Sequence, residues 1–195
     1  MCASIVVLVG CGETEEPVNN ATIEEPVQEI RLNNYVTMVD NYSIKMLNTT
    51  TNDTIEGAVK DRNIAMKLPD TNGYTIKKGY IMYELDDRVK VYTKNPISDE
   101  VEAKLEFYNI LNNMEDLTGK LVNSGSEEIN GNSYYFEEYN SDETRQVRFY
   151  FEGPNLKYAR IIEDDLDEMF EILEILPNPS DTIFEIPTDY TETTE

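Results

Sequence analysis

The side chains that this chain lacks limit the chemistry open to it. It contains no histidine, the commonest general base and metal ligand, and its two cysteines, Cys2 and Cys11, both lie near the N-terminus. The sequence carries no nucleophile-elbow motif, phosphate-binding loop or dinucleotide-binding fingerprint. Its 39 acidic residues leave a glycosidase-like carboxylate pair open, but the context singles out no pair. We therefore expect no catalytic residue, no cofactor and no enzymatic activity.

Two acidic segments approach a calcium-binding pattern without completing it. Residues 70–73 read Asp-Thr-Asn-Gly, like the start of a calcium loop, but no glutamate follows at the required distance. Residues 164–168 carry four carboxylates and lack the invariant glycine. Solvent-exposed charges on hairpins account for both segments, so the sequence predicts no metal site.

Cys11 closes a short apolar run at the N-terminus. Residues 3–9 are mostly apolar but far fewer than the roughly 20 that a membrane-spanning helix needs. Residues 8–11 read Leu-Val-Gly-Cys, which resembles the end of a bacterial lipoprotein signal peptide, where the cysteine is lipidated and becomes the new N-terminus. The chain departs from that pattern because no lysine or arginine precedes Cys11. The alternative is a cytosolic strand over residues 4–9 with an ordinary buried cysteine, which the acidic sequence after Cys11 disfavours.

This resemblance implies a compartment and an anchor. Residues 1–10 would be a signal peptide, and Cys2 would leave with it, so the mature chain would keep one cysteine and no disulfide. Two or three acyl chains on Cys11 would give durable membrane attachment, at about 0.8 kcal/mol per buried CH₂ group. We therefore expect a protein on the extracytoplasmic face of the cell membrane, held by its N-terminal lipid.

An acidic segment separates the predicted anchor from the domain. Residues 12–26 carry five glutamates, two prolines and no basic residue, which is typical of a solvated linker. We assign residues 11–26 to the lipidated cysteine and a tether that reaches roughly 20 Å. The net charge of −23 excludes a general affinity for nucleic acid and opposes flat contact with an anionic bilayer.

Two segments have the periodicity of amphipathic helices. In residues 31–39 apolar side chains recur at helical spacing. In residues 98–117 Asp99 and Glu102 have the spacing of a capping box, and an apolar stripe follows up to a stop at Gly119. Charged residues lie opposite this stripe, so we expect the second helix to pack one face on a sheet.

Most of the remaining sequence alternates apolar and polar residues as strands do. Asn130-Gly131 is the strongest hairpin signal, and residues 168–176 suit either a helix or a strand, for which we predict a long edge strand. The predicted strands are residues 42–46, 54–60, 63–68, 79–85, 88–93, 126–129, 133–139, 146–152, 156–163 and 168–176. These elements predict one α+β, mostly β domain over residues 27–190, followed by a polar tail over residues 191–195. The predicted fold is a single curved antiparallel sheet, an incomplete barrel, with one or two helices packed on its concave face.

Several of these pieces together resemble the lipoprotein-carrier (LolA-like) superfamily, which includes lipid-binding mycobacterial lipoproteins. They are the Leu-Val-Gly-Cys ending at Cys11, the helix–strand unit around residues 35–46, the hairpin over residues 128–136 and the ending at residues 182–190. The likeness covers most of the mature domain and rests on strand and turn patterns. Members of this superfamily hold acyl chains on the concave side of a half-barrel closed by helices.

The resemblance implies a hydrophobic ligand site. A half-barrel with a helical lid leaves apolar surface that an acyl chain can cover, at about 25 cal/mol per Å² buried. The predicted lining residues are Ile44, Met46, Met66, Tyr83, Phe149 and Phe151. For each of these residues the alternative is ordinary core packing against the helix of residues 101–117.

The predicted anchor and half-barrel are compatible with two functions. In the first, the domain binds or carries an acyl-chain ligand in its half-barrel. In the second, it has no small-molecule ligand and is a surface-exposed interaction or sensor module that docks an envelope protein or another cell-envelope component. An apolar interior volume that the helix leaves unfilled would favour the first, and a fully packed interior the second.

Overall fold

The computed structural model describes residues 30–111, 120–140 and 145–194. The predicted signal peptide and tether, residues 1–26, lie outside these ranges. The described chain forms one sheet and four short helical segments: the 3₁₀ helices η1 (Arg31–Asn34), η2 (Val36–Met38) and η3 (Asp181–Phe184), and the α-helix α1 (Asp99–Tyr108). The strands are β1 (Asn41–Asn48), β2 (Thr54–Lys60), β3 (Asn63–Lys67), β4 (Thr75–Lys78), β5 (Ile81–Asp86), β6 (Val91–Pro96), β7 (Leu121–Ile129), β8 (Asn132–Asn140), β9 (Arg145–Glu152), β10 (Asn155–Glu163), β11 (Leu166–Pro177) and β12 (Thr191–Glu192).

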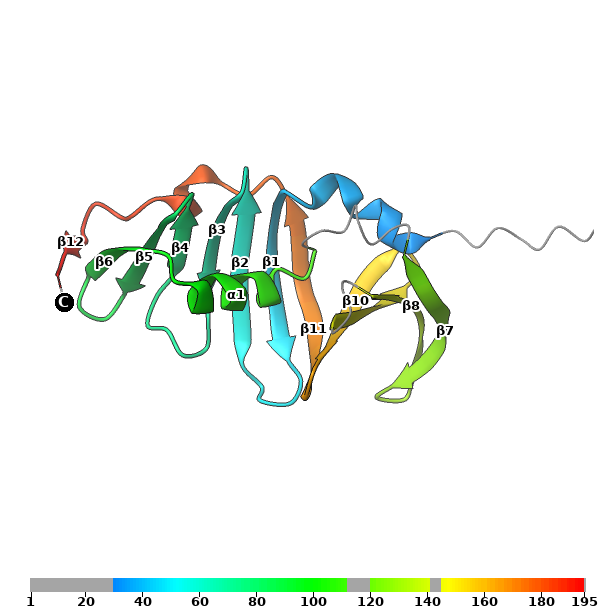
Figure 1. Ribbon diagram of the computed structural model, residues 1–195. Coiled ribbons are helices and arrows are strands. Elements are labelled where there is room, and N and C mark those ends of the chain that lie inside the picture. The colour runs from blue at the N-terminus through cyan, green and yellow to red at the C-terminus, as the bar shows by residue number, and fades with distance from the viewer. Residues whose placement is uncertain (1–29, 112–119, 141–144, 195) are drawn as a thin grey trace, which may run out of the picture.

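The strands form a single open sheet (Figure 1). Its order is β12-β6-β5-β4-β3-β2-β1-β11-β10-β9-β8-β7, so β1 and β11 join two antiparallel meanders in the middle of the sheet. Every neighbouring pair is antiparallel except β12 and β6. The predicted fold class, one curved antiparallel sheet that does not close into a barrel, is confirmed.

Tight turns of the predicted kind connect the strands. Asp61 and Arg62, between β2 and β3, have φ angles of 49° and 68°. Asn130 and Gly131, between β7 and β8, have φ angles of 53° and 80°. Positive φ at both central residues is the geometry of two-residue hairpin turns, which matches the right-handed twist of strands. The sequence therefore fixes these two registers locally.

The position of α1 shows how strongly the sheet curves. The helix contacts Lys77 on β4 through Glu102, while the Phe107 carbonyl accepts a hydrogen bond from Arg145 on β9. A flat sheet would separate β4 from β9 by about 29 Å, six steps of about 4.8 Å, whereas a ten-residue helix is about 15 Å long. The sheet therefore bends around α1, and the face that α1 covers is the concave face (Figure 1).

The two faces of the sheet carry different cores. The main cluster lies on the concave face and takes side chains from the seven consecutive strands β3, β2, β1, β11, β10, β9 and β8. Two smaller clusters lie on the convex face, one under η3 around Phe184 and one on β8 to β10 around Tyr150. Successive side chains of a strand point to opposite faces, so one strand contributes to both cores. On β9, Val147, Phe149 and Phe151 point to the concave face and Tyr150 points to the convex face.

Both predicted helical segments form, with different ends or geometry. Residues 31–38 are two 3₁₀ turns rather than one α-helix. Helix α1 is capped one residue before the predicted cap Asp99, because the side chain of Ser98 accepts a hydrogen bond from the Val101 amide. It ends at Tyr108, and the predicted continuation towards residue 117 falls largely on residues 112–119, outside the described ranges.

The prediction that residues 168–176 form an edge strand is half right. They belong to β11, which is central because it pairs with both β1 and β10. A bulge at Leu173 puts Ile172 opposite Met46 and Ile175 opposite Ile44, so both isoleucines face the concave side. The bulge gives the inward residues a three-residue spacing, which explains the helix-like pattern in the sequence.

Two strands lie outside the predicted set. β4 has four residues between Gly73 and Gly79, too few for alternation to stand out. β12 falls in the predicted polar tail, where Thr191 and Glu192 add a short parallel strand beside β6. Neither strand reaches the main concave cluster.

Candidate functional site: the concave apolar face

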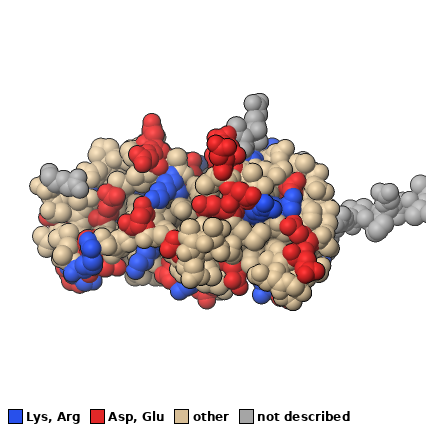
Figure 2. Space-filling model, turned by 90° about the horizontal axis from the view of Figure 1, so that it is seen from below, with Lys and Arg blue, Asp and Glu red and all other residues tan. Residues whose placement is uncertain are grey.

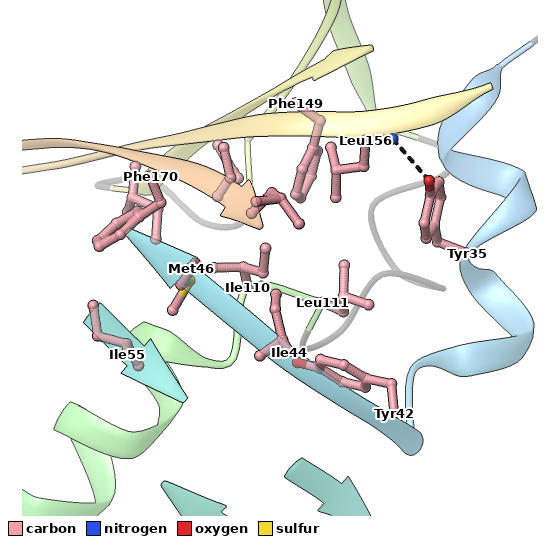
Figure 3. Packing of buried hydrophobic residues seen from close by; sticks show 14 of the residues in the cluster. Tyr35, Tyr42, Ile44, Met46, Ile55, Ile110, Leu111, Phe149, Leu156 and Phe170 are labelled. Carbon is pink, nitrogen blue, oxygen red and sulfur yellow. Dashed lines mark hydrogen bonds between the residues drawn. The ribbon is translucent and has the colours of Figure 1, made fainter. Parts of the chain in front are cut away.

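Five of the six predicted lining residues lie together on the concave face. Ile44 and Met46 on β1, Met66 on β3, and Phe149 and Phe151 on β9 belong to one cluster and are at most 3% exposed. β1 lies between β2 and β11 in the sheet, so it brings the two groups of strands into one surface. Figure 3 shows Ile44, Met46 and Phe149 pointing into the same space.

Tyr83, the sixth predicted residue, lies on the convex face. Tyr83 on β5 pairs with Ile76 on β4, and Ile76 pairs with Ala65 on β3, so these three side chains share one face. Met66 follows Ala65 along β3 and therefore points to the opposite face. The Tyr83 ring packs on Tyr92, with ring centroids 6.3 Å apart. The sequence could not assign this face because β4, which sets the register between β3 and β5, was not predicted.

Helix α1 and the residues after it cover one part of the concave face. Leu105, Ile110 and Leu111 are at most 3% exposed and enter the main cluster. The Phe107 and Tyr108 rings both meet Phe170 edge-on, with centroid distances of 6.4 Å and 5.9 Å. These contacts make α1 an apolar cover over β1, β2 and β11.

The polar contacts that hold α1 lie mostly at its rim. Lys104 pairs with Asp70 at 2.6 Å, and both side chains are more than a third exposed. The hydrogen bond from Lys104 lowers the pKa of the Asp70 carboxyl below its ordinary value. Such exposed pairs contribute at most about 1 kcal/mol each.

One polar contact of this region is buried. The Tyr42 hydroxyl on β1 donates a hydrogen bond to Oδ1 of Asn109, the C-terminal cap of α1. Tyr42 is fully buried and Asn109 is 5% exposed. Burial raises the pKa of the Tyr42 hydroxyl, so it stays a neutral donor at physiological pH. This bond fixes the end of α1 to the sheet.

The segment before β1 covers the other part of the face. Leu32 is fully buried, and the Tyr35 ring packs on Phe151 with a centroid distance of 6.4 Å. The Tyr35 hydroxyl accepts a hydrogen bond from the Leu156 amide at 2.8 Å and donates one to the Pro154 carbonyl at 3.3 Å. η1 and η2 therefore close the face over β9 and β10 (Figure 3).

Two cavities flank α1, and polar residues line most of both. One, of about 160 Å³, has Ile55 and Tyr108 beside carboxylates that include Asp53, Asp70 and Glu168. The other, of about 210 Å³, lies at the opposite side and combines Val59 and Ile64 with charged and amide side chains. None of the five predicted residues on the concave face lines either cavity. In this structure the protein's own side chains fill the predicted site.

Sequence reasoning missed several residues of this face. Ile55 and Val59 follow the strand alternation of residues 54–60 and could have been included. Phe170 lies in the segment whose structure was ambiguous. Glu137 is fully buried on the inner face of β8 between Tyr135 and Tyr139. A charged residue at an inward position of an aromatic strand was the signal for it.

The surface carries the acidic excess of the sequence. Figure 2 shows patches of acidic side chains with fewer basic ones among them. Within the described ranges, no helix is both long and apolar enough to cross a membrane. The same residues contain no group of three or more histidine, cysteine or acidic side chains placed to hold a metal ion.

Comparisons with known proteins give structural neighbours only. No protein-family model and no curated protein sequence matches the chain. Its structure is similar to an uncharacterized conserved protein from Thermus thermophilus, with a TM-score of 0.47, 9% identity, and coverage of 84% of this chain and 96% of that one. It is also similar to LprF from Mycobacterium bovis, with a TM-score of 0.45, 11% identity, and coverage of 83% and 96%. These scores are too low to carry an argument, so the fold class rests on the strand order of the chain itself.

Proposed function

We propose that this chain is the folded domain of a lipid-anchored extracytoplasmic protein that binds an acyl chain on its concave face when α1 moves aside. The observation that carries the proposal is a continuous apolar surface across seven strands, over which the described residues place one ten-residue helix and short flanking segments.

An acyl chain can replace the apolar contacts that the sheet loses when α1 moves. Moving α1 together with the residues that follow it uncovers the places that Leu105, Ile110 and Leu111 fill. An acyl chain restores those contacts at about 0.8 kcal/mol per buried CH₂ group. Met46 and Met66 on the sheet are unbranched and adapt to chains of different shape. The exposed ion pair of Lys104 with Asp70 opposes the movement only weakly, and the buried hydrogen bond from Tyr42 to Asn109 opposes it more strongly.

The predicted anchor suits this activity. A cysteine lipidated at Cys11 and followed by an acidic tether would keep the domain near acyl chains, while the domain's share of the chain's net charge of −23 would keep its surface off anionic lipid. Diffusion to the membrane would then not limit ligand capture.

The packed interior favours a second function. Because the five predicted residues already fill the concave face, the domain is also suited to be an interaction module without a small ligand. In that case the acidic surface would dock an envelope component of opposite charge. Ligand binding separates the two functions.

A titration with a fluorescent long-chain fatty acid tests the first function. We expect saturable binding to the full chain, weakened about tenfold or more by Met66→Gln, since a buried amide without a partner costs about 1–3 kcal/mol. Met169→Gln makes the same change on the convex face and should leave binding intact. Circular dichroism of each variant verifies folding. Absence of saturable binding to the unmodified chain would reject this function and favour the interaction module.

A further inference from the structure

Glu137 is a buried carboxylate in the middle of the inner face of β8. It is fully buried, pairs across the sheet with Phe149 on β9 and Ser124 on β7, and lies between the inward-facing Tyr135 and Tyr139. A carboxylate in such a place is costly unless hydrogen bonds compensate its lost hydration. Its partners therefore show why it is there.

Two of these partners are the first backbone amides of η1. The Arg31 amide donates to Oε1 of Glu137 at 2.6 Å, and the Leu32 amide donates to Oε2 at 3.0 Å. The Tyr139 hydroxyl also donates to Oε2, at 2.9 Å. η1 has no side-chain cap of its own at Ile30. Glu137 thus caps this helix from more than 100 residues away in the sequence.

The segment that Glu137 holds, residues 30–39, is called the strap. Besides the buried Leu32 and the Tyr35 hydroxyl bonds described above, the Arg31 guanidinium lies 4.2 Å from the centre of the Tyr135 ring. These contacts attach the strap to β8, β9 and β10, whereas α1 covers β1, β2 and β11. Among the described residues, two segments therefore cover the concave face: the strap and α1.

We propose that Glu137 is a latch that holds the strap closed, and that release of this latch uncovers Phe151 and Leu156 while the sheet stays paired. Along the described chain, which begins at Ile30, the two amide bonds to Glu137 come before the first strand, β1. The latch goes beyond the proposed function, because it couples the N-terminal segment to the concave face whether or not a ligand binds.

The chemistry of the carboxylate defines the test. Each of its two oxygens accepts one backbone amide, whereas glutamine offers a single accepting oxygen and a donor group in place of the other. Glu137→Gln therefore leaves one of the two amides unpaired. Glu138→Gln is the matched control: Glu138 is 6% exposed, points to the convex face and pairs with Arg148.

Trypsin reports the state of the strap at the latch itself. Arg31 is the first lysine or arginine of the sequence, so cleavage of the Arg31–Leu32 bond removes residues 1–31 as one fragment. In the full chain we expect Glu137→Gln to be cut there about tenfold faster or more, the effect of losing one hydrogen bond to a charged acceptor. The unmodified chain and Glu138→Gln should be cut slowly at this bond. Equal rates for Glu137→Gln and Glu138→Gln would overturn the proposal.

Hydrogen exchange of the unmodified chain is a second test, which is needed if Glu137→Gln unfolds and trypsin cuts it at many sites. The Arg31 and Leu32 amides should be protected, yet exchange about tenfold faster or more than the amides of β8 and β9. Rates equal to those of the sheet would mean that the strap opens only with global unfolding. Unprotected amides would mean that the latch does not form. Either result overturns the proposal, and neither depends on a ligand.

Discussion

At the scale of single residues, a few buried polar groups attach the covers to the sheet. Tyr42 holds the end of α1 and Glu137 holds the start of η1, and both residues face the apolar cluster. Buried polar groups specify the position of their partners, because moving a partner leaves a buried group without its hydrogen bond and raises the free energy of the folded protein. The apolar contacts around them, such as those of Met46 and Phe149, are less directional and can be exchanged for a ligand.

Removal of the Tyr42 hydroxyl tests this division. Tyr42→Phe keeps the ring but leaves Oδ1 of the buried Asn109 without its donor. We expect the free energy of unfolding to fall by about 1–3 kcal/mol, measured by urea denaturation. Tyr80→Phe, at a residue that is 89% exposed, should change it by less than about 0.5 kcal/mol. If the two variants were equally stable, the hydroxyl would not anchor α1.

The residue scale also shows what sequence can predict. Phe149 and Phe151 lie on one face, as the sequence predicts, because β9 alternates without interruption. The face of Tyr83 was not predicted, because it depends on the short β4. The role of Glu137 could not be predicted, because its two backbone-amide partners lie more than 100 residues away and strand alternation does not reveal contacts at that distance.

At the scale of elements, turns and strands with local signals were predicted, and elements that depend on their neighbours were not. The hairpin at Asn130 follows from two residues that adopt positive φ readily. The central place of β11 depends on pairing with β1, more than 100 residues earlier, and its bulge masks the strand pattern. The curvature that makes the concave face is likewise a property of the whole sheet.

The attachment of α1 should depend on pH. Lys104 lowers the pKa of Asp70 in the folded state, so this contribution to stability is present above the unfolded pKa, about 4, and is lost as the pH falls further. Glu168 lines the same cavity beside α1 as Asp70 and has the opposite effect. Burial raises the pKa of Glu168, so its protonation as the pH falls removes the free-energy cost of burying its charge. We therefore expect α1 to loosen only below about pH 4.

A single tryptophan can report this loosening, since the chain has none. In Tyr108→Trp the indole replaces a ring that packs on Phe170, and its emission should shift to the red as the pH falls below about 4. Adding Lys104→Gln removes the partner of Asp70 and should abolish the part of this shift that titrates with Asp70. Identical pH profiles with and without Lys104 would show that the ion pair does not hold α1.

At the scale of the whole molecule, the N-terminal sequence and the fold suggest one arrangement. A domain that carries most of the chain's net charge of −23 would stand away from the bilayer on an acidic tether, with its concave face covered by α1 and by the strap. The strap is the first described segment after the predicted tether, so it is the cover that lies nearer to the predicted anchor in the sequence.

The anchor itself is tested by Cys11→Ala. We expect this variant to leave the membrane fraction of the producing bacterium, because the thioether that carries the acyl chains cannot form. Ser4→Ala, in the same N-terminal run, should remain in the membrane fraction. Unchanged membrane association of Cys11→Ala would contradict lipidation at this residue.

Extraction of the purified Cys11→Ala protein with organic solvent, followed by mass spectrometry of the extract, tests whether the concave face binds an acyl chain. Without the covalent anchor, any acyl lipid that co-purifies must be held by the domain. If the concave face binds an acyl chain, we expect about one acyl lipid per protein. The lipid should be lost from the Met66→Gln form of the same protein but kept by the Met169→Gln form. A lipid-free extract from protein that also takes up no added fatty acid would contradict it.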